Sequence, residues 1–168
     1  MTRAGLALVR VALLAVLGMT LGGCASGFDR KWKAAASATP GDRFAGQWAG
    51  EWRSTRGTHH GALECVFSKQ GAGVYEADFH AHWGHMASSY SVPFKTHAVG
   101  GQLGFDGEKD LGPLFGGVYR YRGQVSPARF SATYASRFDA GVFEMTRVAG
   151  AHRAVSGQEK RAQPQRRD

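Results

Sequence analysis

The chain has 168 residues, which is enough for one domain once targeting and tail segments are set aside. Its 24 glycines recur as single residues and pairs, a pattern that fits many short strands and turns better than helices or collagen. The formal net charge of +8 is a mild bias toward anionic partners such as lipid headgroups, envelope polymers or nucleic acid, and it also serves solubility alone.

Residues 1–23 have the layout of an export signal. Two arginines precede a short apolar run, which is too short to span a bilayer comfortably. The run leads into Leu21-Gly22-Gly23-Cys24, which closely resembles the lipobox of bacterial lipoproteins. This resemblance implies that residues 1–23 are removed and that Cys24 is lipidated on its sulfur and amine. Because Ala25 rather than Asp follows, it also implies sorting to the outer membrane, facing the periplasm.

The next segment, residues 24–42, has no lasting hydrophobic period and is predicted to be the lipidated cysteine with a flexible linker. Trp32, between two lysines, is a candidate for the headgroup interface, for solvent or for packing on the domain. At the other end, residues 149–168 are basic and almost free of apolar side chains, which predicts a disordered tail. Weak contact with an anionic envelope polymer is the alternative to inert solvation of this tail.

Residues 43–148 carry the domain, in short segments that alternate apolar and polar side chains. In the first segment, residues 44–53, Phe44, Trp48 and Trp52 share one face with glycines between them. Large rings beside glycines indicate a tightly curved sheet, because glycine lets a strand bend and leaves room for them. The segment is therefore predicted to be the first strand of a small closed sheet.

Seven further strands are predicted from the same alternation, at about 60–68, 74–83, 86–95, 96–105, 116–122, 128–136 and 142–148. Pro93 indicates an edge or a bulge in the fourth strand, since it cannot donate a backbone hydrogen bond. Gly100-Gly101 is interpreted as a bend in the fifth strand, and Asp106-Gly107 as a turn after it. The predicted fold is all-β, a single antiparallel up-and-down barrel of about eight strands, because closure removes exposed edges.

Gly46-Gln47-Trp48 in the first strand and Arg147 in the last give this barrel a resemblance to the lipocalins and related calycins. In that superfamily a G-x-W tryptophan packs at the closed end beneath an arginine of the last strand. The resemblance implies a cation–π contact between Trp48 and Arg147 that closes the barrel. The chain differs from most lipocalins in its shorter domain, in the lack of predicted leading and trailing helices, and in a second G-x-W at Gly50-Glu51-Trp52.

The barrel's interior is rich in aromatic side chains, which leaves two possibilities open. A barrel of about eight strands encloses either a filled core or one small ligand. In the first case the protein is a structural or protein-interaction module, and in the second it binds a small apolar or amphiphilic ligand. The candidate ligand residues are five tyrosines, whose hydroxyls need partners when buried: Tyr75, Tyr90, Tyr119, Tyr121 and Tyr134.

Histidines are concentrated in the first half of the domain. His80 and His82 share a strand face, and the hairpin through Gly71 is expected to bring His60 beside them, with Asp78 close by. Imidazoles and a carboxylate are suitable ligands for Zn²⁺ or Cu²⁺. The alternative is a set of ordinary surface histidines.

No catalytic motif accompanies these features. The sequence lacks the G-x-S-x-G elbow, the H-E-x-x-H pair and the P-loop. Cys65 lies on an apolar strand face, where a thiolate is disfavoured and no disulfide is expected. The sequence thus predicts a non-enzymatic, membrane-anchored envelope lipoprotein, and export argues against nucleic acid as a partner.

Overall fold

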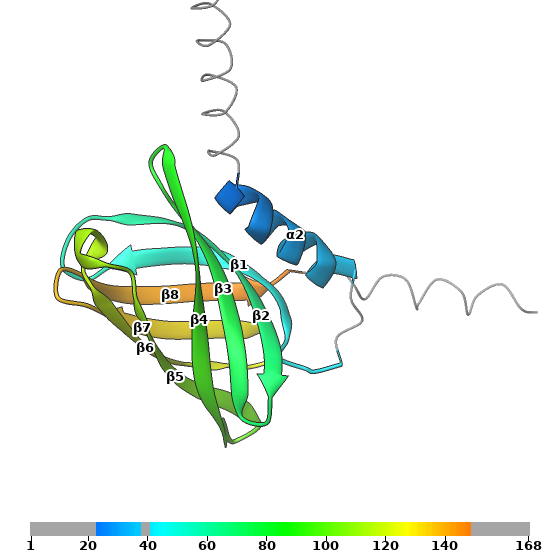
Figure 1. Cartoon of the computed structure of the whole chain (residues 1–168). Helices are drawn as coiled ribbons and strands as arrows, with labels where there is room; N and C mark the ends of the chain where they lie inside the picture. The colour runs from blue at the N-terminus through cyan, green and yellow to red at the C-terminus, as the bar shows by residue number, and fades with distance from the viewer. Residues whose placement is uncertain (1–22, 38–40, 149–168) are drawn as a thin grey trace, which may run out of the picture.

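The computed structural model describes residues 23–37 and 41–148 of the chain. Eight antiparallel strands form a closed barrel, in which each strand pairs with the next and β1 pairs with β8 (Figure 1). The strands are β1 (Gly46–Ser54), β2 (His60–Gly71), β3 (Val74–Trp83), β4 (Met86–Val99), β5 (Gln102–Asp110), β6 (Val118–Val125), β7 (Arg129–Ala135) and β8 (Ala140–Arg147). The predicted all-β, up-and-down barrel is therefore confirmed.

Closure between β1 and β8 depends on a small residue at the seam. The register pairs Trp48 with Arg147, Gly50 with Met145, and Trp52 with Phe143. A Cβ atom on Gly50 would collide with the backbone of β8, so only glycine permits this approach of the two strands. The glycine between the two indoles therefore allows the tight curvature that the sequence predicts.

One half of the lumen is filled by aromatic rings. The large side chains that are fully buried include Trp48, Phe67, Phe79, Phe94, Phe105 and Phe130. Ring centroids lie 4.5 Å apart for Phe94 and Phe105, 5.0 Å for Phe105 and Phe130, and 6.0 Å for Trp48 and Phe130. These tilted contacts give the attractive geometry of aromatic pairs and leave this end of the barrel solid.

A helix that the sequence does not predict lies against the outside of the barrel. The segment expected to be a flexible linker forms α2 (Gly23–Ser37), which contacts the outer face of β1 to β4 (Figure 1). Phe28 and Trp32, one helical turn apart, stack at 5.7 Å and face the barrel. The linker prediction is wrong here, because this short apolar stripe docks on the sheet and the alanine-rich sequence favours helix.

Polar contacts also hold α2 on the barrel. Lys31 Nζ donates to Asp78 Oδ1 at 2.6 Å and to Glu76 Oε1 at 3.3 Å. Gln47 Nε2 donates to the Trp32 carbonyl at 3.0 Å. Trp32 is thus packed on the domain, one of the three placements considered for it. Among the described residues, no helix is both long and apolar enough to cross a membrane.

Strand boundaries differ from prediction around the fourth and fifth strands. Gly100 and Gly101 have φ values of 53° and 82° and form the turn between β4 and β5, so they are not a bend within a strand. The predicted turn at Asp106-Gly107 instead lies inside β5. Gly100 and Gly101 form the turn because both occupy left-handed conformations, which a tight hairpin needs and a bent strand does not.

Pro93 lies at the limit of a short ladder. β4 and β5 pair only from Phe94–Gly107 to Val99–Gln102, whereas β4 pairs with β3 along Met86–Lys95. Pro93 is therefore just outside the β4–β5 ladder, although it faces Glu76 of β3. The strand edge that Pro93 indicates is therefore present, but only on the side of β4 that faces β5. The rest of the barrel is closed.

Candidate functional site

The end of the barrel opposite the filled half is an open mouth. It holds a cavity of about 1200 Å³ that opens to solvent, slightly larger than the roughly 300–1,000 Å³ of most small-molecule sites. Its walls are mostly apolar, with Trp52, Ala81, Trp83, Tyr90, Tyr121 and Phe143 among the lining side chains. The fully buried Phe79 lies at the junction with the filled half. Its ring centroid is 5.3 Å from that of Phe143 and 5.4 Å from that of Tyr90.

Four of the five tyrosines singled out in the sequence line this mouth. Tyr90, Tyr119, Tyr121 and Tyr134 come from β4, β6 and β7 and meet at the cavity. Tyr119 lies 6.3 Å from Tyr121 and 6.0 Å from Tyr134, measured between ring centroids. Strand alternation placed them on the inner face, and the barrel's closure brings β4 opposite β6 and β7.

Burial raises the pKa of Tyr90, Tyr121 and Tyr134, so these three hydroxyls keep their protons at neutral pH. Burial, together with the neighbouring Tyr121 and a hydrogen bond between the two hydroxyls, raises the pKa of Tyr90 well above its ordinary value. Burial also raises the pKa of Tyr134, whose hydroxyl donates to Asp139 Oδ2 at 2.9 Å. The mouth therefore presents neutral phenols on apolar walls, which suit an amphiphilic ligand with a hydrogen-bonding head.

Tyr75 does not join the other tyrosines. It lies in the filled half, stacked on Phe67 at 4.7 Å, and its hydroxyl donates to Asp42 Oδ2 at 2.7 Å. Asp42 also accepts backbone N–H bonds from Phe44 and Ala45. Tyr75 therefore ties the segment before β1 to the barrel and has no access to the mouth cavity, contrary to its prediction as a ligand residue.

Arg147 closes the filled end over Trp48. Its guanidinium carbon lies 4.6 Å from the centroid of the Trp48 ring, so the predicted cation–π contact is present and involves the first of the two G-x-W tryptophans. A Cβ atom on Gly46, whose φ is 135°, would approach Arg147 Nη1 to 2.7 Å. The glycine before this tryptophan thus leaves space for the arginine.

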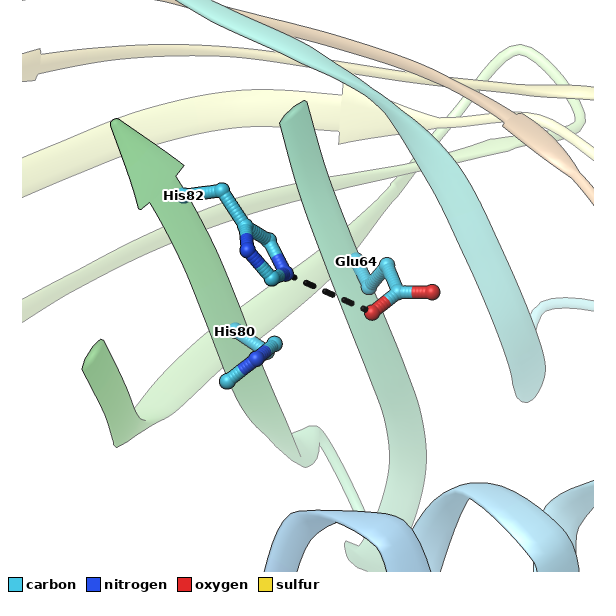
Figure 2. Close-up of side chains that lie close together, drawn as sticks. All are labelled: Glu64, His80 and His82. Carbon is cyan, nitrogen blue, oxygen red and sulfur yellow. Dashed lines mark ion pairs between the residues drawn. The ribbon is translucent and has the colours of Figure 1, made fainter. Parts of the chain in front are cut away.

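Outside the barrel, three side chains of types that can ligate a metal meet on β2 and β3 (Figure 2). Glu64 lies directly opposite His80 in the ladder, and His82 is two residues along the same face. One ligand atom from each lies within 4.8 Å of the other two, and His82 Nε2 is 4.0 Å from Glu64 Oε2. All three residues are half-buried.

Of the four predicted metal ligands, His80 and His82 belong to this group, whereas His60 and Asp78 lie outside it. The ladder sets His60 near the mouth, where its ring contacts the Thr58 carbonyl and lines the cavity. Asp78 faces outward as predicted, but α2 buries it and its carboxylate accepts from Lys31 and Ser91. Glu64 was missed because the β2–β3 register, which is shifted by an irregularity between Lys69 and Gly71, cannot be derived from alternation alone.

The two cysteines lie in different elements of the structure. Cys65 is fully buried on the inner face of β2, and burial raises the pKa of its thiol well above the ordinary value, in agreement with the inert thiol predicted. Cys24 lies in the first turn of α2. Residues 1–22 of the predicted export signal (1–23) and the whole predicted tail at 149–168 lie outside the described residues.

Comparison of the chain with protein-family models, with curated proteins and with solved structures finds no match.

Proposed function

We propose that the protein is a membrane-anchored, lipocalin-like lipoprotein of the cell envelope that binds a small apolar or amphiphilic ligand in the open mouth of its barrel. The observation that carries this proposal is the cavity of about 1200 Å³ at one end of a barrel whose other end is solid. The lipobox at Leu21–Cys24 supports lipidation of Cys24 and placement in the outer membrane, facing the periplasm.

The shape of the lumen supports a carrier over a solid interaction module. Phe79, Tyr121 and Phe143 lie at the bottom of the mouth, so an apolar chain entering the mouth would stop at a rigid aromatic layer. Neutral phenol groups near the rim offer donors and acceptors to a polar head. Such a division into apolar depth and polar mouth is typical of sites for amphiphilic molecules.

The test is displacement of a fluorescent apolar probe, 1-aminoanthracene, by straight-chain fatty acids, with the full chain carrying Cys24→Ser to prevent lipidation. Ser88→Trp places a large ring in the mouth, because Ser88 lines the cavity on β4. We expect this variant to weaken probe binding at least tenfold. Thr146→Trp is the matched control, since Thr146 is exposed on the outer face of β8. Equal binding by both variants, or no binding by the parent chain, would favour a structural or protein-interaction module.

A second candidate function is metal binding, which the group formed by Glu64, His80 and His82 supports (Figure 2). His80 Nδ1 is 2.6 Å from Ser89 Oγ, which fixes the ring and leaves Nε2 available to an ion. Phe28 of α2 stacks on the same ring at 5.0 Å and restricts its motion further. Two imidazoles and one carboxylate form a three-ligand set suited to Zn²⁺ or Cu²⁺.

Isothermal titration of the Cys24→Ser chain with Zn²⁺ and Cu²⁺ tests this candidate. We expect dissociation constants at or below micromolar levels and at least a tenfold weakening in Glu64→Gln and His82→Ala. His60→Ala should bind like the parent chain, because His60 lies at the mouth and apart from the group. Absence of binding, or equal loss in the His60 variant, would contradict the site.

A further inference from the structure

Large apolar side chains project from the rim of the mouth. They come from three separate connections: Met86 from the β3–β4 hairpin, Leu114 and Phe115 from the short 3-10 helix at Pro113–Phe115, and Phe138 from the β7–β8 connection. Their exposed fractions are 60%, 91%, 62% and 60%, the highest among the large hydrophobic side chains of the described residues. We call these four side chains the apolar rim.

Three different loops thus place apolar residues at the same end of the barrel. Monomeric soluble proteins seldom gather exposed large hydrophobics in one area without a binding role. The closed end is different, because its exposed large hydrophobic side chains are the smaller and less exposed Val74, Val99 and Val148, at 39%, 47% and 36%. The asymmetry between the two ends indicates that the mouth end is the one suited to an apolar partner.

Basic side chains accompany the apolar rim. Arg137 lies 5.6 Å from the Phe138 ring centroid, and Arg56 Nη1 donates to the Arg137 carbonyl at 3.2 Å. The nearby carboxylate of Asp139 is directed inward, where it accepts from Ser54 and Tyr134. The apolar rim can insert among lipid chains while Arg56 and Arg137 contact anionic headgroups, and the Asp139 carboxylate faces inward, away from them. This combination suits an anionic lipid surface.

The orientation of α2 along the barrel is consistent with a partner at the mouth. Trp32 contacts Gln47 near the closed end, Lys31 contacts Asp78 farther along, and Phe28 stacks on His80 nearer the mouth. The start of α2 accordingly lies on the side of the β3–β4 hairpin (Figure 1). Cys24, in the first turn, is therefore on the mouth side of the barrel.

From these observations we infer that the mouth faces the membrane, with the apolar rim seated among anionic lipids and the cavity open to the bilayer. This orientation rests in part on the proposed lipid anchor at Cys24, but the apolar rim and its arginines are independent of it. It also identifies the source of the ligand that the proposed function requires: an amphiphile drawn from the bilayer enters the cavity without crossing water.

The experiment uses an environment-sensitive fluorophore on single cysteines in the full chain with Cys24→Ser. Leu114→Cys places the label at the apolar rim, and Ala128→Cys places it on the exposed β6–β7 connection at the closed end. Cys65 is fully buried and does not compete for the label. Vesicles of phosphatidylglycerol and phosphatidylethanolamine are then added, with phosphatidylcholine vesicles in parallel.

We expect the label at position 114 to shift to shorter wavelength and to gain at least twofold in intensity with the anionic vesicles, while the label at position 128 stays unchanged. Adding Phe115→Ser and Phe138→Ser should reduce the response at position 114 by half or more. No response at position 114, or an equal response at position 128, would overturn the inference. So would size-exclusion chromatography showing that the response at position 114 comes from self-association of the protein and not from vesicle binding. Because this readout needs no ligand, a failure of the inferred orientation can be told apart from a failure of the proposed ligand site, which the probe displacement tests.

Discussion

The guanidinium of Arg147 covers the ring of Trp48 and at the same time joins the two ends of the domain. Nη1 donates to the Ala45 carbonyl at 2.8 Å, Nη2 to the Arg43 carbonyl at 2.6 Å, and Nε to the Pro127 carbonyl at 2.8 Å. One side chain of the last strand thus binds the segment before β1 and the β6–β7 connection.

Replacing Arg147 with lysine keeps the charge but loses this planar fork of donors. We expect Arg147→Lys to lower the free energy of unfolding by about 2–3 kcal/mol, because a lysine cannot serve three carbonyls in fixed directions. Urea denaturation followed by tryptophan fluorescence measures the change. Arg53→Lys is the control, since Arg53 makes only an exposed ion pair with Glu51 and should cost less than about 0.5 kcal/mol. Similar losses in both variants would show that the fork is unimportant.

Asp42 should make the barrel sensitive to acid. Burial alone would raise the pKa of Asp42, but hydrogen bonds from Tyr75 and two backbone N–H groups, with Lys69 nearby, lower it below the ordinary value of 3.8. The folded state therefore favours the ionised form, and the resulting stability is present above about pH 4 and is lost as the pH falls through the folded pKa. We expect Asp42→Asn to reduce the loss of stability between pH 6 and pH 3.

Urea denaturation at several pH values measures this dependence. Asp106→Asn, an exposed position on β5, should retain the pH profile of the parent chain. An Asp42→Asn chain with an unchanged profile would mean that other carboxylates set the acid limit.

The Lys31–Asp78 pair should control how firmly α2 stays on the barrel. Lys31→Ala leaves the nearly buried Asp78 carboxylate with Ser91 as its remaining side-chain donor, and we expect a loss of about 1–3 kcal/mol. The hydrogen bond to Asp78 raises the pKa of Lys31 above its ordinary 10.5, so the contribution is complete below that pH and is lost as the pH rises through the higher folded value. Hydrogen exchange of α2 amides should accelerate in Lys31→Ala. Lys33→Ala, at an exposed position of α2, should leave the exchange unchanged.

Cys65 should resist modification until the barrel opens. Its side chain is fully buried, and burial raises the pKa of the thiol, so neither access nor thiolate is available in the folded state. In a Cys24→Ser chain, we expect alkylation by iodoacetamide at pH 8 to be at least a hundredfold slower than in guanidinium chloride. Comparable rates would indicate that β2 separates readily from the barrel.

The barrel could be predicted from the sequence because alternation is a local signal. Tyr75, Ala77 and Phe79 alternate with polar residues, and this pattern alone fixes which side chains face the lumen. The contact of Trp48 with Arg147 followed from a resemblance rather than from alternation. Helix α2 was missed because its docking face consists of little more than Phe28 and Trp32, too few for a clear helical period.

The sites depended on features that no local pattern contains. The position of Glu64 opposite His80 follows from the register of the β2–β3 hairpin. The mouth cavity follows from the way β4 meets β6 and β7 across the lumen, which placed Tyr90 near Tyr121 but left Tyr75 in the filled half. Sequence reasoning could name the aromatic residues, but it could not say which of them remain accessible.

The central claim, that the mouth of the barrel holds a ligand, is tested most directly by nuclear magnetic resonance of the labelled Cys24→Ser chain during titration with a medium-chain fatty acid. We expect saturable chemical shift changes at Ala81, Tyr90, Tyr121 and Phe143, with no change at Trp48, Phe105 or Phe130. Changes confined to the outer surface, or the absence of saturable changes in the mouth, would contradict the account.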